Sequence, residues 1–312
     1  GADQFSPAND SLLRKSIINS SKVVLAGKID VTRELLLENM DTYSIRKVHE
    51  NFSNIFYDVD SSLGIVQPPP DYDGVFRRYL PYVKSGLTDQ LIPSFGFALL
   101  NKYYGLKNNQ TATRQGDYFE LGEKLIPQYD RNSILINYYG ANRTFPHIKL
   151  IDVLDDKEFK TIDEIELDVE INTWDDPDYG ILHSEKFKDK IVIIGSTMPE
   201  DRDLFPVSFA KGKRKGDNLM YGVEFHANIV QNIIRNEFLY IQPKWMEIIS
   251  IILFTAFIFF LTSVIRKIKL RFGIIIEVLN VLLVVLSVYL YFRFSVYLFI
   301  NQKIVAAIVS PS

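Results

Sequence analysis

The sequence predicts an α/β domain, built as a mixed sheet flanked by helices and followed by transmembrane α-helices. Three segments carry this prediction. The segment 190–195 contains a continuous apolar run, which is typical of a central strand covered on both faces. Residues 223–236 divide their apolar and polar side chains between two halves of a helical wheel. Residues 248–265 contain no charged residue and approach the ~20 residues that a helix needs to cross a bilayer.

The elements expected before the central strand come from local patterns. Capped apolar segments predict helices, apolar runs predict strands, and prolines with Asp-Gly predict turns. In chain order they are a helix over 10–18, a strand over 22–26, a rigid turn over 68–74, an extended stretch over 75–83, a helix over 93–100 and a strand over 133–138. Residues 28–54 have no clean period and receive no prediction. Residues 101–130 are polar and are expected to form loops.

The helix expected over residues 223–236 centres His226 on its apolar half, beside Phe225 and several Ile and Val residues. Glu224 and Asn228 lie on the polar half. A histidine in such a position is either a hydrogen-bonded structural imidazole or a functional residue, which contacts a ligand or acts as a pH switch. The pattern favours the structural role, and both interpretations stay open.

The C-terminal part of the chain has the pattern of a membrane hairpin. A first span is expected at residues 244–265 and a second at residues 272–292. The basic hinge between them, residues 266–271, holds four cations in six residues, which the positive-inside rule places in the cytoplasm. Residues 1–243 are therefore expected outside the cytoplasm, and residues 296–312 begin a third span.

The net charge also differs between the part before the membrane hairpin and the hairpin itself. Of the 35 Lys and Arg and the 38 Asp and Glu, seven basic and two acidic residues lie in residues 241–312. Residues 1–240 keep 28 basic and 36 acidic residues, a net charge of −8, which does not suit the phosphates of a nucleic acid. The chain has no cysteine, which excludes disulfides, thiolate zinc sites and cysteine nucleophiles.

Both ends of the sequence are expected to be truncated. The first residues, from Gly1, supply no initiator Met, no basic n-region and no apolar h-region, although a domain outside the cytoplasm needs an export segment. The third apolar run ends at Ser312 before it is long enough to span a bilayer. We therefore expect a signal or membrane helix upstream and further chain downstream.

The first candidate motif consists of Asp71, Asp73 and Gly74, followed closely by Arg77 and Arg78. Asp-x-Asp-Gly also opens a calcium loop, but such a loop needs a Glu at its twelfth position, where this chain has a Tyr. Two arginines this close repel a cation and can pair with either aspartate. The motif therefore predicts a hydrogen-bonded turn with a structural role, and no metal site.

The second candidate site lies just past the predicted central strand, at the place where open α/β sheets collect ligands. It lacks the glycine-rich fingerprint of a phosphate site. The candidate ligand-binding residues are Gly195, Ser196, Thr197, Asp203 and His226. Asp201 and Arg202 precede Asp203, and these three either line a polar mouth or belong to a charged surface loop.

Five motifs occur in a fixed order before the membrane hairpin. They begin at Asp71, Ile136, Phe187, Asp203 and Gly222, and the last of them also contains Glu224 and Asn228. In this order they resemble a CHASE domain of type 2, the extracytoplasmic sensory domain attached to bacterial cyclases and histidine kinases. The resemblance spans about residues 3–243 and includes the membrane helices that follow.

The resemblance implies a periplasmic or extracellular sensor in a multi-pass receptor of the bacterial inner membrane. It implies an unknown extracytoplasmic ligand and, in the same full-length chain, a cytoplasmic effector: an adenylate or guanylate cyclase, or a histidine or Ser/Thr kinase. Because a sensor and its effector communicate through coupled states, we also expect a homodimer. The opening helix and early strands of the family are missing here, so part of the sheet is expected to be absent.

No catalytic signature is present, because the sequence has no Gly-x-Ser-x-Gly elbow, no His-Glu-x-x-His helix and no Walker loop. We therefore predict no catalytic residue, no cofactor and no enzymatic activity for this fragment. Two alternatives stay open. One is a membrane-tethered extracytoplasmic hydrolase that uses Asp201, Asp203 and His226. The other is a multispan transporter subunit, in which Glu277 and Asn280 inside the second span are functional.

Overall fold

The computed structural model describes most of the chain in eight ranges. These are residues 7–39, 42–52, 63–85, 90–201, 203–209, 216–240, 244–267 and 281–282. Contacts between residues divide the chain into two units, Gly1–Phe238 and Leu239–Ser312. Each unit is described by itself.

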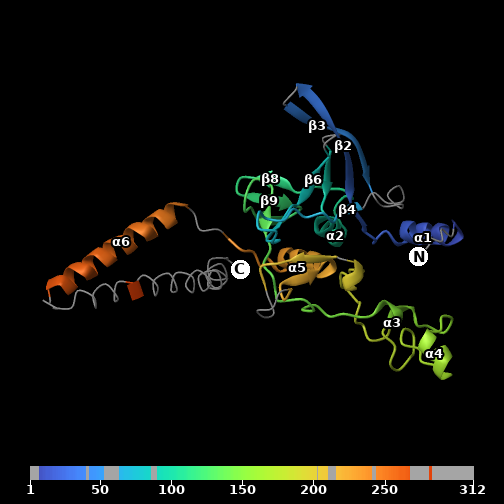
Figure 1. Cartoon of the computed structure of the whole chain (residues 1–312). Helices are drawn as coiled ribbons and strands as arrows, with labels where there is room; N and C mark the ends of the chain where they lie inside the picture. The colour runs from blue at the N-terminus through green and yellow to red at the C-terminus, as the bar shows by residue number, and fades with distance from the viewer. Residues whose placement is uncertain are drawn as a thin grey trace. The chain divides into compact units, whose positions relative to one another are not determined.

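The first unit is mixed α/β, as the sequence predicts, but its described strands form six small sheets instead of one (Figure 1). One pair is parallel, β1 (Leu25–Gly27) with β4 (Leu63–Ile65). The antiparallel pairs are β2 (Ile29–Asn39) with β3 (Thr42–Phe52), β5 (Arg78–Tyr79) with β11 (Ile134–Leu135), β6 (Tyr82–Lys84) with β7 (Leu91–Pro93), and β12 (Leu204–Pro206) with β13 (Leu219–Tyr221). The sixth sheet has three strands, β8 (Thr113–Gln115), β9 (Tyr118–Leu121) and β10 (Lys124–Pro127).

Five described helices lie among these strands in the first unit. They are α1 (Pro7–Ser20), α2 (Phe95–Tyr103), α3 (Leu150–Leu154), α4 (Ile162–Leu167) and α5 (Gly222–Arg235), with a 3₁₀ turn at Pro199–Asp201. The helices predicted over 10–18, 93–100 and 223–236 are confirmed as α1, α2 and α5. The strands predicted over 22–26 and 133–138 are present in shorter form as β1 and β11.

Residues 28–54, for which no pattern was clear, contain the long ribbon of β2 and β3. Each of these strands has 11 residues, and their register shifts twice along the hairpin. A register shift displaces the alternation of side chains between the two faces. This explains why no clean period of two runs through the sequence.

The loop predicted over residues 101–130 is wrong, because the three-stranded sheet of β8, β9 and β10 lies there. Its turns contain Gly116 and Gly122, both with a positive φ. Phe119 and Leu121 alternate with more exposed residues and are fully buried. The strands have only three or four residues each, which is too short to stand out from a polar background.

The central strand predicted over residues 190–195 is also wrong. Among the described residues it pairs with no other strand, and its backbone is not assigned to any regular element. Ile191 packs against the core, but Val192 and Ile194 are 48% and 75% exposed. The segment is therefore covered on one face only, because the apolar run lacks the neighbouring strands that a central position requires.

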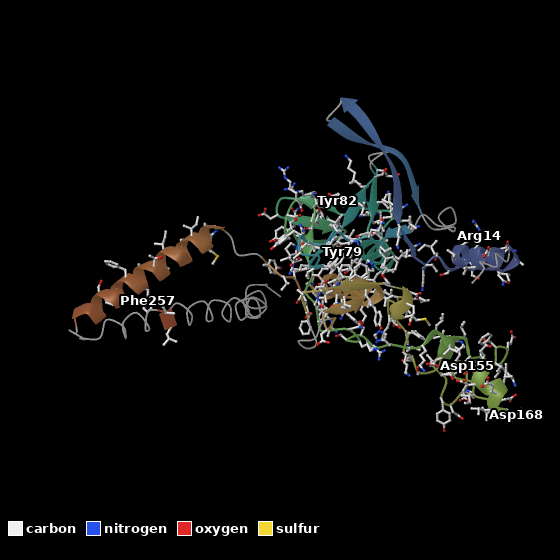
Figure 2. The ribbon with its side chains drawn as sticks, in the orientation of Figure 1. Arg14, Tyr79, Tyr82, Asp155, Asp168 and Phe257 are labelled. Carbon is white, nitrogen blue, oxygen red and sulfur yellow. The ribbon has the colours of Figure 1, made fainter. Side chains whose placement is uncertain are left out.

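The core of the first unit forms where α2 and α5 pack against each other and against the short strands. Phe225 is completely buried at its centre, with its ring against those of Phe76, Tyr79, Tyr138 and Phe205. Side chains gather densely around Tyr79 in Figure 2. Aromatic residues bury more surface than any other side chains, so this cluster dominates the stability of the unit.

The fold of residues 150–182 is held by buried carboxylates that accept hydrogen bonds, and not by an aromatic cluster. Glu164 completes a capping box with Thr161 at the start of α4 and also accepts the backbone N–H of Ile171 at 2.7 Å. The carboxylate of Asp155 accepts both the backbone N–H and the hydroxyl of Thr173. Both carboxylates are buried, so each short loop closes around one hydrogen-bonded acid.

The described part of the second unit is mainly α6 (Lys244–Lys267), a helix of 24 residues. Many of its large apolar side chains are exposed, including Leu253, Phe259 and the Phe257 labelled in Figure 2. Of the helices that the structure describes, none combines the length and hydropathy required to cross a bilayer.

Several sequence predictions lie outside the described residues. They concern Arg202, residues 268–271 of the hinge, nearly all of the span predicted at 272–292 with Glu277 and Asn280, and the third span at 296–312.

Candidate functional site

A cleft of about 320 Å³ brings together several of the predicted ligand-binding residues. Gly195, Asp203 and His226 all line it, and so do Asp201 and Gly222. Ser196 and Thr197 are not among the lining residues; the Ser196 hydroxyl instead accepts the backbone N–H of Met198 at 3.1 Å. The volume lies at the lower end of the range for small-molecule sites.

Other walls of the cleft come from distant parts of the chain. Lys28 and Ala26 lie at the junction of β1 and β2, and the apolar part is formed by Val66, Phe95, Ile193, Ile194 and Val223. The N-terminus of α5 also reaches the cleft through Gly222 and Val223. Charged side chains of both signs therefore face the same space as an apolar wall.

Gly222 and Asp203 are held together at the β12–β13 pair. The N–H of Gly222 donates to the carbonyl of Asp203 at 3.0 Å, and a Cβ at position 222 would overlap the carboxylate of Asp203. Only glycine allows this close approach. The carboxylate of Asp203 consequently lies against the first residue of α5.

The environment of Asp203 disfavours its charged form. Partial burial raises the pKa of Asp203, nearby Asp201 raises it further, and Lys28 opposes the shift. Among the described residues, the carboxylate has no hydrogen bond or ion pair to satisfy it. Such a group gains from a partner that supplies a positive charge or a hydrogen-bond donor.

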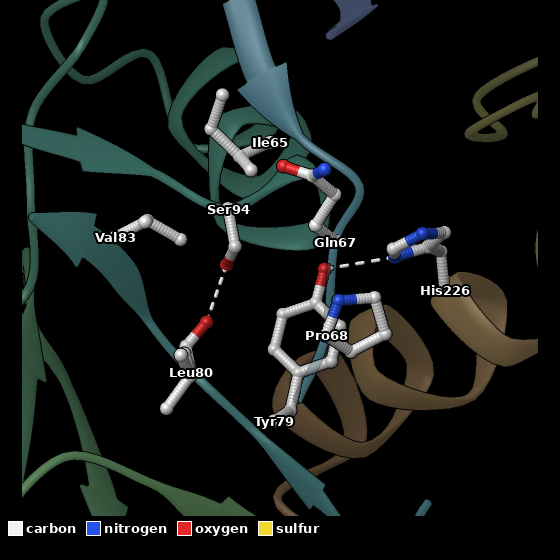
Figure 3. Close-up of a pocket in the computed structure, with 8 residues that line it drawn as sticks. All are labelled: Ile65, Gln67, Pro68, Tyr79, Leu80, Val83, Ser94 and His226. Carbon is white, nitrogen blue, oxygen red and sulfur yellow. Dashed lines mark hydrogen bonds between the residues drawn. The ribbon is translucent and has the colours of Figure 1, made fainter. Parts of the chain in front are cut away.

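His226 is 4% exposed and lines two spaces, the cleft and a small cavity of about 10 Å³ shown in Figure 3. Its Nδ1 lies 2.9 Å from the hydroxyl of Tyr79, which itself accepts the backbone N–H of Gly96 at 2.8 Å. When the hydroxyl donates its proton to Nδ1, the imidazole proton lies on Nε2. The small cavity is about the size of one water molecule.

Burial determines the charge of this pair. Complete burial lowers the pKa of His226 to about 3, and burial likewise raises the pKa of Tyr79. Both groups are therefore neutral at neutral pH. The structural interpretation of His226 agrees with its hydrogen bond to Tyr79, although the same ring also borders the cleft.

Replacing His226 with Gln is expected to make the protein less sensitive to acid. Between pH 6.5 and about 3 the unfolded chain protonates this histidine and the folded chain does not, so stability falls as the pH decreases. The loss from this group is about 1.4 kcal/mol per pH unit. The free energy of unfolding at about pH 7 and about pH 5 should therefore change less in the variant. Replacing the exposed His183 with Gln is the control, and equal slopes in wild type and His226→Gln would contradict the neutral buried imidazole.

The aspartate–arginine motif forms a network of ion pairs around the turn. Arg77 donates to Asp71 at 3.0 Å and to Asp73 at 2.8 and 2.9 Å, while Arg78 donates to Asp71 and, at 3.1 Å, to Asp130. The hydrogen bonds from Arg77 lower the pKa of Asp73 to about 2. Gly74 closes the turn with φ +79° and donates its N–H to the carbonyl of Asp71. The carboxylates are thus occupied by arginines.

A stripe of polar side chains along α5 binds the backbone of residues 137–143. The amide of Asn232 makes two hydrogen bonds to the backbone of Asn137, at 2.9 and 2.8 Å. Asn228 accepts the N–H of Tyr139 at 3.0 Å. Buried Glu224 accepts the N–H of Arg143 at 2.8 Å, and its other oxygen lies 3.6 Å from Nε2 of His147. The half of α5 that looked solvent-facing in the sequence is therefore an internal docking face.

Sequence reasoning missed several residues of these sites. Tyr79, Lys28 and Asp130 carry no local signal, because their roles depend on contacts across 147, 175 and 52 positions respectively. Asn232 did carry one, since it follows Asn228 by four residues on the same helical face. Both asparagines therefore share the polar half of the predicted helix.

The chemistry of the cleft suits binding better than hydrolysis. Asp201, Asp203 and His226 line the same cleft, as the hydrolase alternative requires. The imidazole Nδ1, however, is already hydrogen-bonded to Tyr79, and the low pKa of His226 makes it a weak base. A general base needs a pKa near the working pH.

Comparison with known proteins gives one family. The model of the CHASE2 domain matches residues 2–261, which is most of the chain. No curated protein and no solved structure matches. CHASE2 is a family of extracytoplasmic sensory domains, so the expected resemblance is confirmed at the level of the family. The ordered motifs, the turn at Asp71–Gly74 and the N-terminal turn of α5 all lie within the match, and the chain belongs to the CHASE2 domain family.

Proposed function

We propose that this chain is the sensory part of a bacterial transmembrane receptor. Residues 1–243 lie outside the cytoplasm, and a small ligand binds in the cleft between Lys28, Asp203 and His226. The match to CHASE2 over residues 2–261 is the observation that carries the proposal. The cleft supports it, because α5 begins at this cleft and so a ligand can act directly on the helix.

The route of the signal follows the chain. Only eight residues separate Arg235, the end of α5, from Lys244, the start of α6. Within them the carbonyl of Glu237 accepts the side-chain N–H of Asn137 at 3.1 Å. A shift of α5 on ligand binding therefore has a short path to α6, and a homodimer would convert that shift into a change between paired helices.

Membrane insertion is part of the proposal. Residues 248–265 contain no charged residue, and the large apolar side chains of α6 whose exposure the structure describes, among them Leu253, Phe257 and Phe259, are exposed. Residues 244–265, 272–292 and 296–312 form the spans of a multi-pass protein of the inner membrane, with the basic hinge 266–271 in the cytoplasm. This orientation leads the chain to a cytoplasmic effector, an adenylate or guanylate cyclase or a protein kinase.

Single cysteines test the topology, since the chain has none of its own. Tyr72 is fully exposed in its turn and suits labelling from outside the cytoplasm. We expect a membrane-impermeant thiol reagent on spheroplasts to label Tyr72→Cys and not Ile268→Cys, and to label both after detergent lysis. Labelling of position 268 alone in intact spheroplasts would reverse the topology. Release of the protein by carbonate washing would refute membrane insertion.

The effector is tested by the coding sequence beyond residue 312 and by its output. We expect a cyclase or kinase domain there, and an output that changes when Asp203 is replaced by Asn although the protein folds normally. A stop codon within a few tens of codons would refute the receptor. The membrane-tethered hydrolase, favoured by the shared cleft of Asp201, Asp203 and His226, would then become the leading function.

A further inference from the structure

The cleft contains hydrogen-bond donors and acceptors of opposite charge in one small space. Asp201 and Asp203 supply two carboxylates, and Lys28 supplies an ammonium group. His226 adds a donor in the tautomer that carries its proton on Nε2, because within the described part of the chain its one hydrogen-bond partner is Tyr79 at Nδ1. The first turn of α5 adds the partial positive charge of a helix N-terminus.

A simple anion or a simple cation can pair with only some of these charged groups. A simple anion would meet Lys28 and His226 but face the two carboxylates, and a simple cation would meet the carboxylates but face Lys28. A molecule with an ammonium group and a carboxylate satisfies both halves. The partly buried carboxylate of Asp203 gains most, since among the described residues no side chain or backbone group donates a hydrogen bond to it and an ammonium group supplies one.

The apolar wall of the cleft determines which side chain the ligand carries. Phe95, Ile193 and Val223 border the cleft together with Val66 and Ile194. Ile194 is 75% exposed, which leaves its surface available to a ligand. A hydrated metal ion makes no use of such a wall, whereas a small hydrocarbon side chain buries it.

We propose that the cleft binds a free amino acid with an apolar side chain. Its ammonium group lies between Asp201 and Asp203, its carboxylate lies towards Lys28 and the Nε2–H of His226, and its side chain covers Ile193 and Ile194. The inference rests on the proposed function, because it names the class of ligand for the same sensory site.

Binding to the full chain in detergent micelles tests the idea by calorimetry. The probes are alanine, valine, leucine and phenylalanine, with leucine methyl ester and N-acetyl-leucine as derivatives that keep only the positive or only the negative charge. At least one free amino acid should bind, and its two singly charged derivatives should bind at least tenfold more weakly. Equal binding of the ester would indicate a cation site, equal binding of the N-acetyl form an anion site, and either result would overturn the proposal.

Variants locate the site. Asp203→Asn preserves the shape of the side chain beside Gly222 and should weaken binding at least tenfold, and Lys28→Gln should weaken it severalfold. Asp117→Asn, at an exposed turn between β8 and β9, is the matched control and should bind as the wild type does. Unchanged binding in Asp203→Asn would place the ligand elsewhere and overturn the proposal.

Absence of binding by all four amino acids, in a protein that unfolds cooperatively, would also overturn the ligand class. It would leave the receptor untouched, because the labelling and effector experiments do not depend on the ligand. Failure of those experiments with intact amino-acid binding would instead reject the receptor and keep the site.

Discussion

Truncating Phe225 to Ala is expected to remove most of the stability of the sensory unit. The ring is completely buried, and its centroid lies 5.1 Å from that of Phe205 and 5.8 Å from that of Tyr79. Removing a buried aromatic ring costs about 3–5 kcal/mol, because the lost burial is joined by a cavity that the surroundings fill only partly. Typical domains have about 5–15 kcal/mol in total.

Chemical denaturation followed by tryptophan fluorescence measures this loss, since Trp174 lies in the first unit. Replacement of the exposed Tyr72 with Ala is the control, with a change within about 0.5 kcal/mol. Phe225→Leu should fall between the two because it leaves a smaller cavity. A loss below about 1 kcal/mol in Phe225→Ala would contradict a single core centred on this ring.

Replacing Gly64 with Ala is expected to have an effect of similar size, although it adds only one methyl group. Gly64 lies in β4, and a Cβ there would overlap the Cα of Phe95 at the start of α2 and approach the Cβ of Ala98 to 3.1 Å. Backbone atoms cannot rotate away, so β4 and α2 must separate. Overpacking of this kind costs about 3 kcal/mol.

The paired strand offers a matched control. Gly27 lies in β1, directly beside β4, and a Cβ there meets the terminal methyl Cδ1 of Leu63 at 2.7 Å. A side-chain end can adjust where a backbone cannot, so Gly27→Ala should cost about 1 kcal/mol. Both values come from denaturation midpoints at equal slope. Equal stability of Gly64→Ala and wild type would show that β4 and α2 do not pack this closely in solution.

Elements with a strong local signal could be predicted from the sequence. α5 combines an apolar stripe with an asparagine that ends it in the left-handed conformation, and α2 begins directly after Pro93 and Ser94. The sheet of β8, β9 and β10 could not, because each strand is too short to show a period. The prediction of a central strand over residues 190–195 failed for a different reason. An apolar run reports the tendency to be buried, but a strand also needs hydrogen-bonding neighbours, and among the described residues none pairs with it.

The candidate site was predictable in part. Gly195, Asp203 and His226 lie 8 and 23 positions apart in the chain and line one cleft. The place of Gly195 directly after an apolar run correctly indicated that it borders a cleft, even though the run is not a strand. Lys28 could not be anticipated, because nothing local places the start of β2 beside the start of α5. Long-range contacts of this kind follow from the fold as a whole.

The hydrogen bonds between α5 and residues 137–139 constrain how the helix can move. Asn228 and Asn232 are one helical turn apart, about 6 Å along the axis, and they bind the amides of Tyr139 and Asn137, which in an extended chain are separated by about 6.7 Å. The rise of one helical turn is therefore close to the distance between the two amides, so both hydrogen bonds form at the same time. A continuous slide of α5 would break both contacts together, so a displacement carries residues 137–139 along or advances by a whole turn. In a sensor of this kind, the position of α5 would change between discrete states and would not shift continuously with the stimulus.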